Sequence, residues 1–185
     1  MPHPDVLDKN QTALVVVDMQ EAFRKAIPAF AEIASRIVQM IRGCRILDVP
    51  IVVTEQYPKG LGRTAEEILF SLPDDFEFIE KTAFSSCGAK TFTDKLESFG
   101  AKQILLCGIE AHICVNQTGH DLLENGYQVH ILTDCIGSRF EHDKLAAIQK
   151  LTMNGAFPSG VEMSLFELLR DSRHEQFKEI QQLIK

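Results

Sequence analysis

The segment 13–17, Ala-Leu-Val-Val-Val, restricts the fold of this chain more than any other feature, because none of its side chains is polar. A strand that is apolar on both faces has to be covered on both faces, which is typical of parallel sheets packed between helices. We expect this strand over 12–18. Five further segments have the composition of short strands: 50–54, 76–80, 103–108, 127–133 and 157–161.

Longer stretches with a helical period separate these strands. Phe30, Ile33 and Ile37 recur at the spacing of one helical face and predict a helix over 28–47. Further helices are expected at 64–70, 91–99, 113–124, 142–154, 164–169 and 174–185. Strands that alternate with helices pair in parallel through crossover connections. The pattern therefore predicts an α/β fold, a three-layer α/β/α sandwich around a six-stranded parallel sheet.

Length and composition narrow the class of protein. We expect a single domain over residues 1–185, because domains commonly contain about 100–200 residues. Acidic side chains outnumber basic ones, 26 to 19, which gives a formal charge of −7. That balance argues against nucleic acid and anionic membranes as partners, since both are bound through Lys and Arg. No segment has the pattern of a signal peptide or a membrane span. The five cysteines include no C-x-x-C pair, which favours free thiols and a cytoplasmic location.

Polar residues follow the predicted strands at the edge of the sheet where ligands bind in such folds. Asp18, Lys81 and Cys114 form a chemical set there: an acid, a cation and a thiol, each beyond a different strand. Cys114 lies near the start of a predicted helix, a place that lowers the pKa of a thiol below about 8.5. Each residue also has a simpler interpretation: a small buried side chain for Cys114, a cap or solvated acid for Asp18 and a solvated lysine for Lys81.

Metal and nucleotide sites have weaker support. Asp18, Glu55 and Glu80 could gather around Mg²⁺, but the sequence has no paired-histidine motif, and we expect no metal and no cofactor. The segment Gly60–Ala65 has the form G-x-G-x-x-A of a dinucleotide site. It follows the second predicted strand after a gap of five residues, so we interpret it as a loop at the rim of a pocket.

Two local spacings concern residues close to these candidates. Thr64 is followed three residues later by Glu67, a spacing that could form a capping box for the helix over 64–70. His112 precedes Cys114 by two residues, and in a helix or tight turn that spacing points the two side chains apart. We therefore expect His112 at most to line the site.

Three segments together resemble the isochorismatase-like cysteine hydrolases. They are Val15–Gln20 (Val-Val-Val-Asp-Met-Gln), Glu80–Ser85 (Glu-Lys-Thr-Ala-Phe-Ser) and Cys107–Val115 (Cys-Gly-Ile-Glu-Ala-His-Ile-Cys-Val). The likeness runs from about residue 12 to 169, with the three motifs in order and with fitting spacing. Each motif ends a predicted strand, so the three together are a specific signal.

The resemblance implies a strand order of 3-2-1-4-5-6 and a catalytic triad of Asp18, Lys81 and Cys114. Asp18 would take the thiol proton, Lys81 would stabilise the charges, and Cys114 would attack a carbonyl carbon to form a thioester. The resemblance also implies a non-proline cis peptide between Ile109 and Glu110. That bend would turn the backbone N–H groups of Glu110 and Cys114 toward one point, an oxyanion hole. An amide or related carbonyl compound is the implied substrate.

The residues around the implied triad narrow the branch of the family. The nicotinamidases of the family look as though they need Asp-x-His after the second strand, whereas this chain has Thr-Glu-Gln-Tyr-Pro at 54–58. The branch that cleaves isochorismate lacks the nucleophilic cysteine, which is present here as Cys114. The chain therefore looks like the metal-free branch with unassigned substrates. The residues expected to line the substrate pocket are Gln20, Phe23, Gln56, Tyr57, Phe84 and Ile109.

Three classes of function are compatible with the sequence. A cysteine hydrolase of a small molecule is favoured over a protein that keeps the triad but acts through assembly or partner binding, and over a nucleotide-binding or redox enzyme. A homo-oligomer, a dimer or a tetramer, is expected from the resemblance. The predicted C-terminal helix carries apolar residues that could serve an interface or pack on the domain's own core: Phe177, Ile180, Leu183 and Ile184.

Overall fold

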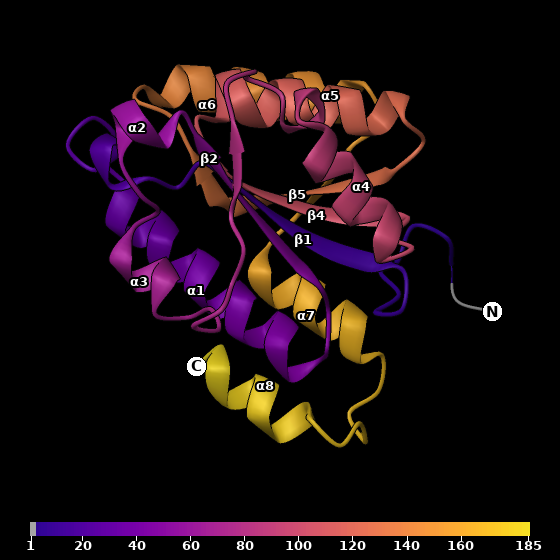
Figure 1. Ribbon diagram of the computed structural model, residues 1–185. Coiled ribbons are helices and arrows are strands. Elements are labelled where there is room, and N and C mark those ends of the chain that lie inside the picture. The colour runs from indigo at the N-terminus through magenta and orange to yellow at the C-terminus, as the bar shows by residue number, and fades with distance from the viewer. Residues whose placement is uncertain (1–2) are drawn as a thin grey trace.

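A computed structural model of the chain describes residues 3–185 and contains one six-stranded sheet (Figure 1). All strand pairs are parallel, and the strand order is β3-β2-β1-β4-β5-β6. The predicted fold class and strand order are therefore confirmed. The strands are β1 (Thr12–Val17), β2 (Ile51–Gln56), β3 (Ile79–Lys81), β4 (Gln103–Ile109), β5 (Gln128–Gly137) and β6 (Phe157–Ser159).

Helices cover both faces of the sheet, as the apolar strands require (Figure 1). One face carries α1 (Phe30–Ile46), α3 (Glu66–Leu69), α7 (Val161–Leu169) and α8 (Phe177–Leu183). The other face carries α4 (Lys90–Ser98), α5 (Asn116–Glu124) and α6 (Glu141–Met153). The short helix α2 (Pro58–Leu61) follows the end of β2. No helix within residues 3–185 is long and apolar enough to cross a membrane.

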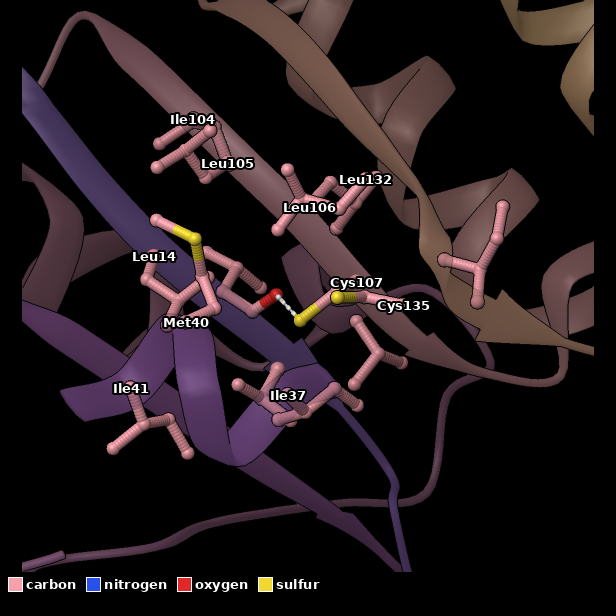
Figure 2. Packing of buried hydrophobic residues seen from close by; sticks show 14 of the residues in the cluster. Leu14, Ile37, Met40, Ile41, Ile104, Leu105, Leu106, Cys107, Leu132 and Cys135 are labelled. Carbon is pink, nitrogen blue, oxygen red and sulfur yellow. Dashed lines mark hydrogen bonds between the residues drawn. The ribbon is translucent and has the colours of Figure 1, made fainter. Parts of the chain in front are cut away.

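The core lies between the sheet and these helices. Every side chain of β1 and β4 is buried, which explains why both strands are apolar on their two faces. Figure 2 shows Ile37 and Met40 of α1 packed toward Leu14 of β1 and Cys107 of β4. The Cys107 thiol donates to the carbonyl oxygen of Val15 at 3.5 Å, so this cysteine belongs to the core.

The structure differs from the predicted elements at the weaker strands. β3 covers only Ile79–Lys81, later than the predicted 76–80, so Lys81 lies in the strand rather than after it. β5 continues to Gly137, four residues beyond the predicted 127–133, past a shift in its register with β4. Gly60 and Leu61, predicted to lie in a loop, are the last two residues of α2.

The predicted capping box does not form. α3 begins at Glu66 and has no side-chain cap. The Thr64 hydroxyl donates instead to Glu55 Oε1 at 2.8 Å, and Glu67 accepts from Arg24 at 2.8 Å. Both side chains are thus used by residues distant in sequence, which a local motif cannot reveal.

The C-terminal helix packs on its own chain. In α8, Ile180 is fully buried, and Phe177, Leu183 and the following Ile184 are partly buried against the core. Phe177 also meets Phe166 of α7 edge to face, with ring centroids 6.1 Å apart. The apolar face of this helix is therefore occupied by intramolecular packing.

Candidate active site

Asp18 stands directly after β1, where the chain leaves the sheet. Its φ is +50°, an uncommon value for a residue other than glycine and one that appears most often at functional or tightly determined positions. The residue is 1% exposed. Its Oδ1 accepts from the Thr54 hydroxyl at 2.7 Å, and its Oδ2 accepts from Lys81 Nζ at 2.6 Å. The carboxylate is therefore fixed by residues of two other strands, β2 and β3.

Lys81 is the last residue of β3, and its side chain is fully buried. The ammonium group has acceptors on several sides: Asp18 Oδ2 at 2.6 Å, Gln56 Oε1 at 2.7 Å, the Phe84 carbonyl at 3.0 Å and the Ala83 carbonyl at 3.2 Å. A buried cation is tolerated only when it is paired and its N–H groups are satisfied, and this environment meets both conditions.

Cys114 lies in a π-helical turn, Ala111–Val115, between β4 and α5. Such turns are rare and often occur at functional sites. The residue is 7% exposed. Burial raises the pKa of the Cys114 thiol to about 12, with further raising by the negative charge of Asp18 and by a hydrogen bond to Asp18, and with partial opposition from Lys81. The thiol therefore lies close to the Asp18–Lys81 pair.

The direction of this pKa shift is opposite to the one expected from the sequence. The expectation rested on a helix N-terminus stabilising a thiolate. In the structure burial is the largest influence, and the nearest acid, Asp18, adds a like charge to that of a thiolate. Burial and Asp18 thus both favour the protonated thiol over the thiolate.

The turn that carries Cys114 begins at an unusual backbone position. The peptide bond between Ile109 and Glu110 is cis. The Glu110 carbonyl accepts from the N–H groups of Ile113 and Val115, at 3.1 and 3.2 Å, which closes the turn around the thiol. The Glu110 side chain is buried, and its Oε1 accepts from Arg139 Nε at 2.8 Å.

His112 faces away from this centre, as its spacing from Cys114 suggested. Its Nδ1 is 2.9 Å from the Ser138 hydroxyl, and its Nε2 is 3.9 Å from Asp143 on α6. The imidazole thus contacts α6 and the end of β5. The side chain that could accept the thiol proton is therefore Asp18 rather than His112.

The predicted substrate-lining residues fall into two groups. Tyr57 and Phe84 are exposed, each at 54%, and are free to contact a ligand. Phe23 is partly buried against the core, and Ile109 is fully buried. Gln20 is also fully buried, so its amide has a structural role.

The amide of Gln20 is used entirely by the backbone of neighbouring segments. Its Nε2 donates to the carbonyls of Gln56 and Gly62, at 3.1 and 2.7 Å, and its Oε1 accepts from the Gln56 N–H at 2.8 Å. The side chain of Gln56 is also committed, to Lys81 and to the Thr82 carbonyl. Both glutamines therefore support the site from within the protein.

A cleft of about 420 Å³ borders Lys81. Its lining comprises Tyr57, Pro58, Lys59, Glu80, Lys81, Thr82, Ala83, Gly88 and Ala89. Cys114 does not line it, so the cleft borders the lysine side of the site. The Gly60–Ala65 segment is not in this lining; Gly60 supports the ring of Tyr57, because a Cβ at Gly60 would lie 2.5 Å from that ring.

The carboxylates considered for Mg²⁺ are kept apart. Asp18 is bound to Lys81 and Thr54, whereas Glu55 accepts from the backbone and hydroxyl of Thr64 at 2.7 and 2.8 Å. Within residues 3–185, no group of three His, Cys, Asp or Glu side chains is placed to share a metal ion.

Two contacts of the site were not found from the sequence. Thr54 bonds Asp18 because it lies beside Val17 in the register of β1 and β2, a pairing that requires the sheet order. Arg139 binds Glu110 because β5 extends to Gly137, beyond its predicted end. The sequence shows a polar residue near the end of β2 and another just after β5, but it does not show which side chain each of them contacts.

Comparisons with known proteins agree on the family. The family model described as "Isochorismatase domain" matches residues 12–163. A zebrafish (Danio rerio) protein, isochorismatase domain-containing protein 2, is 40% identical over 179 residues, which cover 96% of this chain and 89% of that protein. Its human counterpart is 41% identical over 175 residues, covering 94% of this chain and 83% of that one.

Solved structures share the same fold. One described as the MAR1 ribonuclease of Caenorhabditis elegans has a TM-score of 0.92 and 38% identity, covering 97% of this chain and 92% of the nematode chain. The Escherichia coli YcaC protein, described as an octameric hydrolase of unknown specificity, has a TM-score of 0.85 and 21% identity, covering 100% of this chain and 96% of that one. At that identity the bacterial structure shows the fold alone.

Proposed function

The chain belongs to the isochorismatase family, and on that premise we propose that it is a cysteine-dependent hydrolase of a small amide or related carbonyl compound. The family supports a hydrolase, and one observation carries the finer proposal. A single carboxylate, that of Asp18, is hydrogen bonded to the buried ammonium of Lys81 and lies beside the Cys114 thiol. The three groups come from the ends of three different strands: Asp18 follows β1, Lys81 ends β3 and Cys114 lies in the turn after β4.

The proposed reaction begins with a neutral thiol. Because the pKa of Cys114 is raised to about 12, the thiol has to lose its proton as it attacks the substrate carbonyl, and Asp18 is the base within reach. Lys81 compensates the negative charge that then develops on sulfur. The protonated Asp18 returns the proton to the leaving amine, which leaves a thioester on Cys114.

Hydrolysis of the thioester completes the proposed cycle. A water molecule attacks the acyl carbon while Asp18 takes one of its protons, and the thiol is released in the neutral form that burial favours. The backbone N–H groups of Glu110 and Cys114 are proposed to hold the oxyanion in both halves of the reaction. No cofactor takes part in these steps.

The exposed aromatic side chains near the site suggest where the substrate binds. Tyr57 and Phe84 are each 54% exposed, and Tyr57 lines the cleft beside Lys81. We propose that they cover the apolar part of a small substrate, with Phe23 and Ile109 as packing support behind the site. The cleft of about 420 Å³ beside Lys81 lies within the ordinary size range of small-molecule sites, in keeping with a small amide as the proposed substrate.

Reaction of the protein with a panel of small amides tests this proposal. We expect wild-type protein to form a covalent acyl adduct on Cys114, detected by peptide mass spectrometry, and Cys114→Ala to have no turnover. Cys87→Ala is the matched control, because Cys87 is a partly buried thiol outside the site, and it should keep full activity. Turnover that survives in Cys114→Ala would overturn the proposal.

RNA belongs in the same panel because the similar nematode protein is described as a ribonuclease. The net charge of −7 makes a polyphosphate a poor ligand for this chain, and we expect no cleavage. A homo-oligomer is also proposed, in keeping with the octameric YcaC, and light scattering on the purified protein tests it. A large assembly with no turnover on any amide would favour a role in assembly or partner binding.

A further inference from the structure

Gln56 is the last residue of β2 and lies beside Lys81 of β3 in the register of the sheet. Its side-chain Oε1 accepts from Lys81 Nζ at 2.7 Å, and its Nε2 donates to the Thr82 carbonyl at 2.7 Å. The amide therefore bridges the buried ammonium and the loop that follows β3.

The orientation of this amide is determined by its two partners. Lys81 can only donate, so the group that faces it has to be the amide oxygen. The Thr82 carbonyl can only accept, so the group that faces it has to be the NH₂. Exchange of the two ends would break both hydrogen bonds, and Gln56 is held in one orientation in which both ends of its side chain are bound within the protein.

The backbone of Gln56 is held as firmly as its side chain. Its N–H donates to Gln20 Oε1 at 2.8 Å, and its carbonyl accepts from Gln20 Nε2 at 3.1 Å. Gln20 is fully buried and also binds the Gly62 carbonyl at 2.7 Å. The two glutamines thus form a continuous support that runs from the loop before α3 to the ammonium of Lys81.

We propose that Gln56 is a positioning residue for Lys81, which supplies a neutral acceptor that directs the ammonium toward Asp18, and that it is not a contact to substrate. This inference rests on the proposed function. The ammonium has three N–H groups, and Gln56 Oε1, at 2.7 Å, is a closer acceptor than the Phe84 and Ala83 carbonyls at 3.0 and 3.2 Å. It therefore holds one N–H without a charge of its own and leaves the positive charge available to the carboxylate and the thiol. A carboxylate at the same place would compete with Asp18 for the proton and the charge of Lys81.

The charged groups around the thiol set the direction of the expected effects. Asp18 reaches Cys114 from β1, Lys81 from β3 and Glu110 from the end of β4; the first and last raise the pKa of the thiol, whereas Lys81 lowers it. Loss of the acceptor at Gln56 weakens the fixed position of Lys81 and so its effect on the thiol. An added negative charge at Gln56 cancels part of the Lys81 charge and opposes the thiolate directly.

The test compares Gln56→Met, which removes the acceptor at similar volume, with Gln56→Glu, which adds the charge. The readout is the rate of iodoacetamide labelling of Cys114 between pH 7 and 10, followed by peptide mass spectrometry. Only the thiolate reacts, so the rate at a given pH falls about ten-fold for each unit by which the pKa rises. We expect labelling to slow about three-fold in Gln56→Met and about ten-fold in Gln56→Glu.

Matched controls separate this effect from a general one. Gln149 of α6 is exposed, so Gln149→Met and Gln149→Glu should label at the wild-type rate. Thermal unfolding of each variant establishes that the labelled protein is folded. Once a substrate is found, kcat should fall in the Gln56 variants with KM unchanged.

The alternatives give different results. Labelling profiles equal to wild type in both Gln56 variants would overturn the inference, and a raised KM with unchanged labelling would make Gln56 a substrate contact. Lys81→Met distinguishes this failure from that of the proposed function. If Lys81→Met also leaves labelling unchanged, the proposed triad is wrong; if it slows labelling while the Gln56 variants do not, only the role of Gln56 is wrong.

Discussion

The two halves of the candidate site are built differently. Asp18 and Lys81, at the ends of β1 and β3, have side chains 2% and 0% exposed, and Asp18, Gln56 and two backbone carbonyls surround the ammonium. On the other side, beyond β4 and β5, Glu110 is bound by Arg139, whose side chain is 48% exposed. The first half is closed by the protein, and the second is partly open to solvent.

This difference separates the groups that must be prepared in advance from those that meet the substrate. A base and a cation act best when their geometry is set before the substrate arrives, because no reorganisation is then needed during the reaction. A nucleophile has to reach the substrate and later release it. We therefore expect changes in the first half to affect stability strongly, and changes in the second half to affect reactivity with little effect on stability.

The largest effect is expected where the two halves touch. Gly108 of β4 pairs with Val17 of β1, and a Cβ at this glycine would lie 2.1 Å from the Val17 carbonyl oxygen. Neither backbone can yield without separating the central strands, so we expect Gly108→Ala to lose more than about 4 kcal/mol of unfolding free energy in urea. Gly126→Ala is the control, since its φ is also positive, +84°, but no atom lies within 4 Å of the added carbon. Equal effects of the two substitutions would show that β1 and β4 can move apart at Gly108 with little loss of stability.

Breaking the buried ion pair should have the next largest effect. Lys81→Met leaves the Asp18 carboxylate buried without its cation, which costs about 3–5 kcal/mol. Adding Asp18→Asn to that variant should restore part of the loss, because the unpaired charge is removed. The control is Lys90→Met, whose partner Asp94 forms an exposed pair on α4 with 84% of the lysine side chain accessible. Urea unfolding measures the stability of Lys81→Met, of the double variant and of Lys90→Met. If Lys81→Met is as stable as Lys90→Met, the Asp18–Lys81 pair is not shielded from solvent as its burial indicates.

Apolar segments were easier to predict from the sequence than polar ones. The apolar segment of β1 predicted a strand covered on both faces, because apolar side chains on both faces have to be kept from water. β5 was predicted too short, since Thr133 and Asp134 are polar and mark an apparent end, whereas the strand runs on to Gly137. In the structure, Thr133 donates to the Ser159 carbonyl at 3.0 Å, and Asp134 accepts from the Val161 N–H at 3.2 Å, so both polar groups are satisfied beside β6.

Positions at the site were easier to predict than the state of each group. The order of the motifs identified Asp18, Lys81 and Cys114 as residues that could meet. The sequence predicted a lowered pKa for Cys114, although burial and Asp18 raise it, because the degree of burial depends on how the whole turn packs. It also did not reveal the hydrogen bond between Gln56 and Lys81, since a polar side chain at a strand end looks the same whatever its partner is.

Alkaline pH provides a further test of the second half. The pKa of Cys114 rises from an ordinary value of 9.0 to about 12 in the folded protein. As pH increases above 9, the unfolded chain releases this proton and the folded chain does not, so stability falls with rising pH. Between pH 8 and pH 10 this thiol should remove at most about 1.4 kcal/mol. Over the same pH range, the unfolding free energy of Cys114→Ala in urea should therefore fall by about 1.4 kcal/mol less than that of wild type. If the two proteins show the same pH dependence, the thiol is less buried than its surroundings indicate.

The smallest effect on stability is expected from the open ion pair, and it gives the sharpest contrast with Lys81. Arg139→Met should cost less unfolding free energy than Lys81→Met, because the Arg139 side chain is 48% exposed and water can replace part of its contact with the buried Glu110 carboxylate. The same change removes the cation that compensates Glu110, whose negative charge opposes a thiolate at Cys114. Iodoacetamide labelling of Cys114 should therefore slow in Arg139→Met and recover when Glu110→Gln is added. Two results would show that the halves of the site do not differ in the way their burial indicates. One is a stability loss in Arg139→Met comparable with that in Lys81→Met, and the other is a Cys114 labelling rate that changes in neither Arg139→Met nor the double variant.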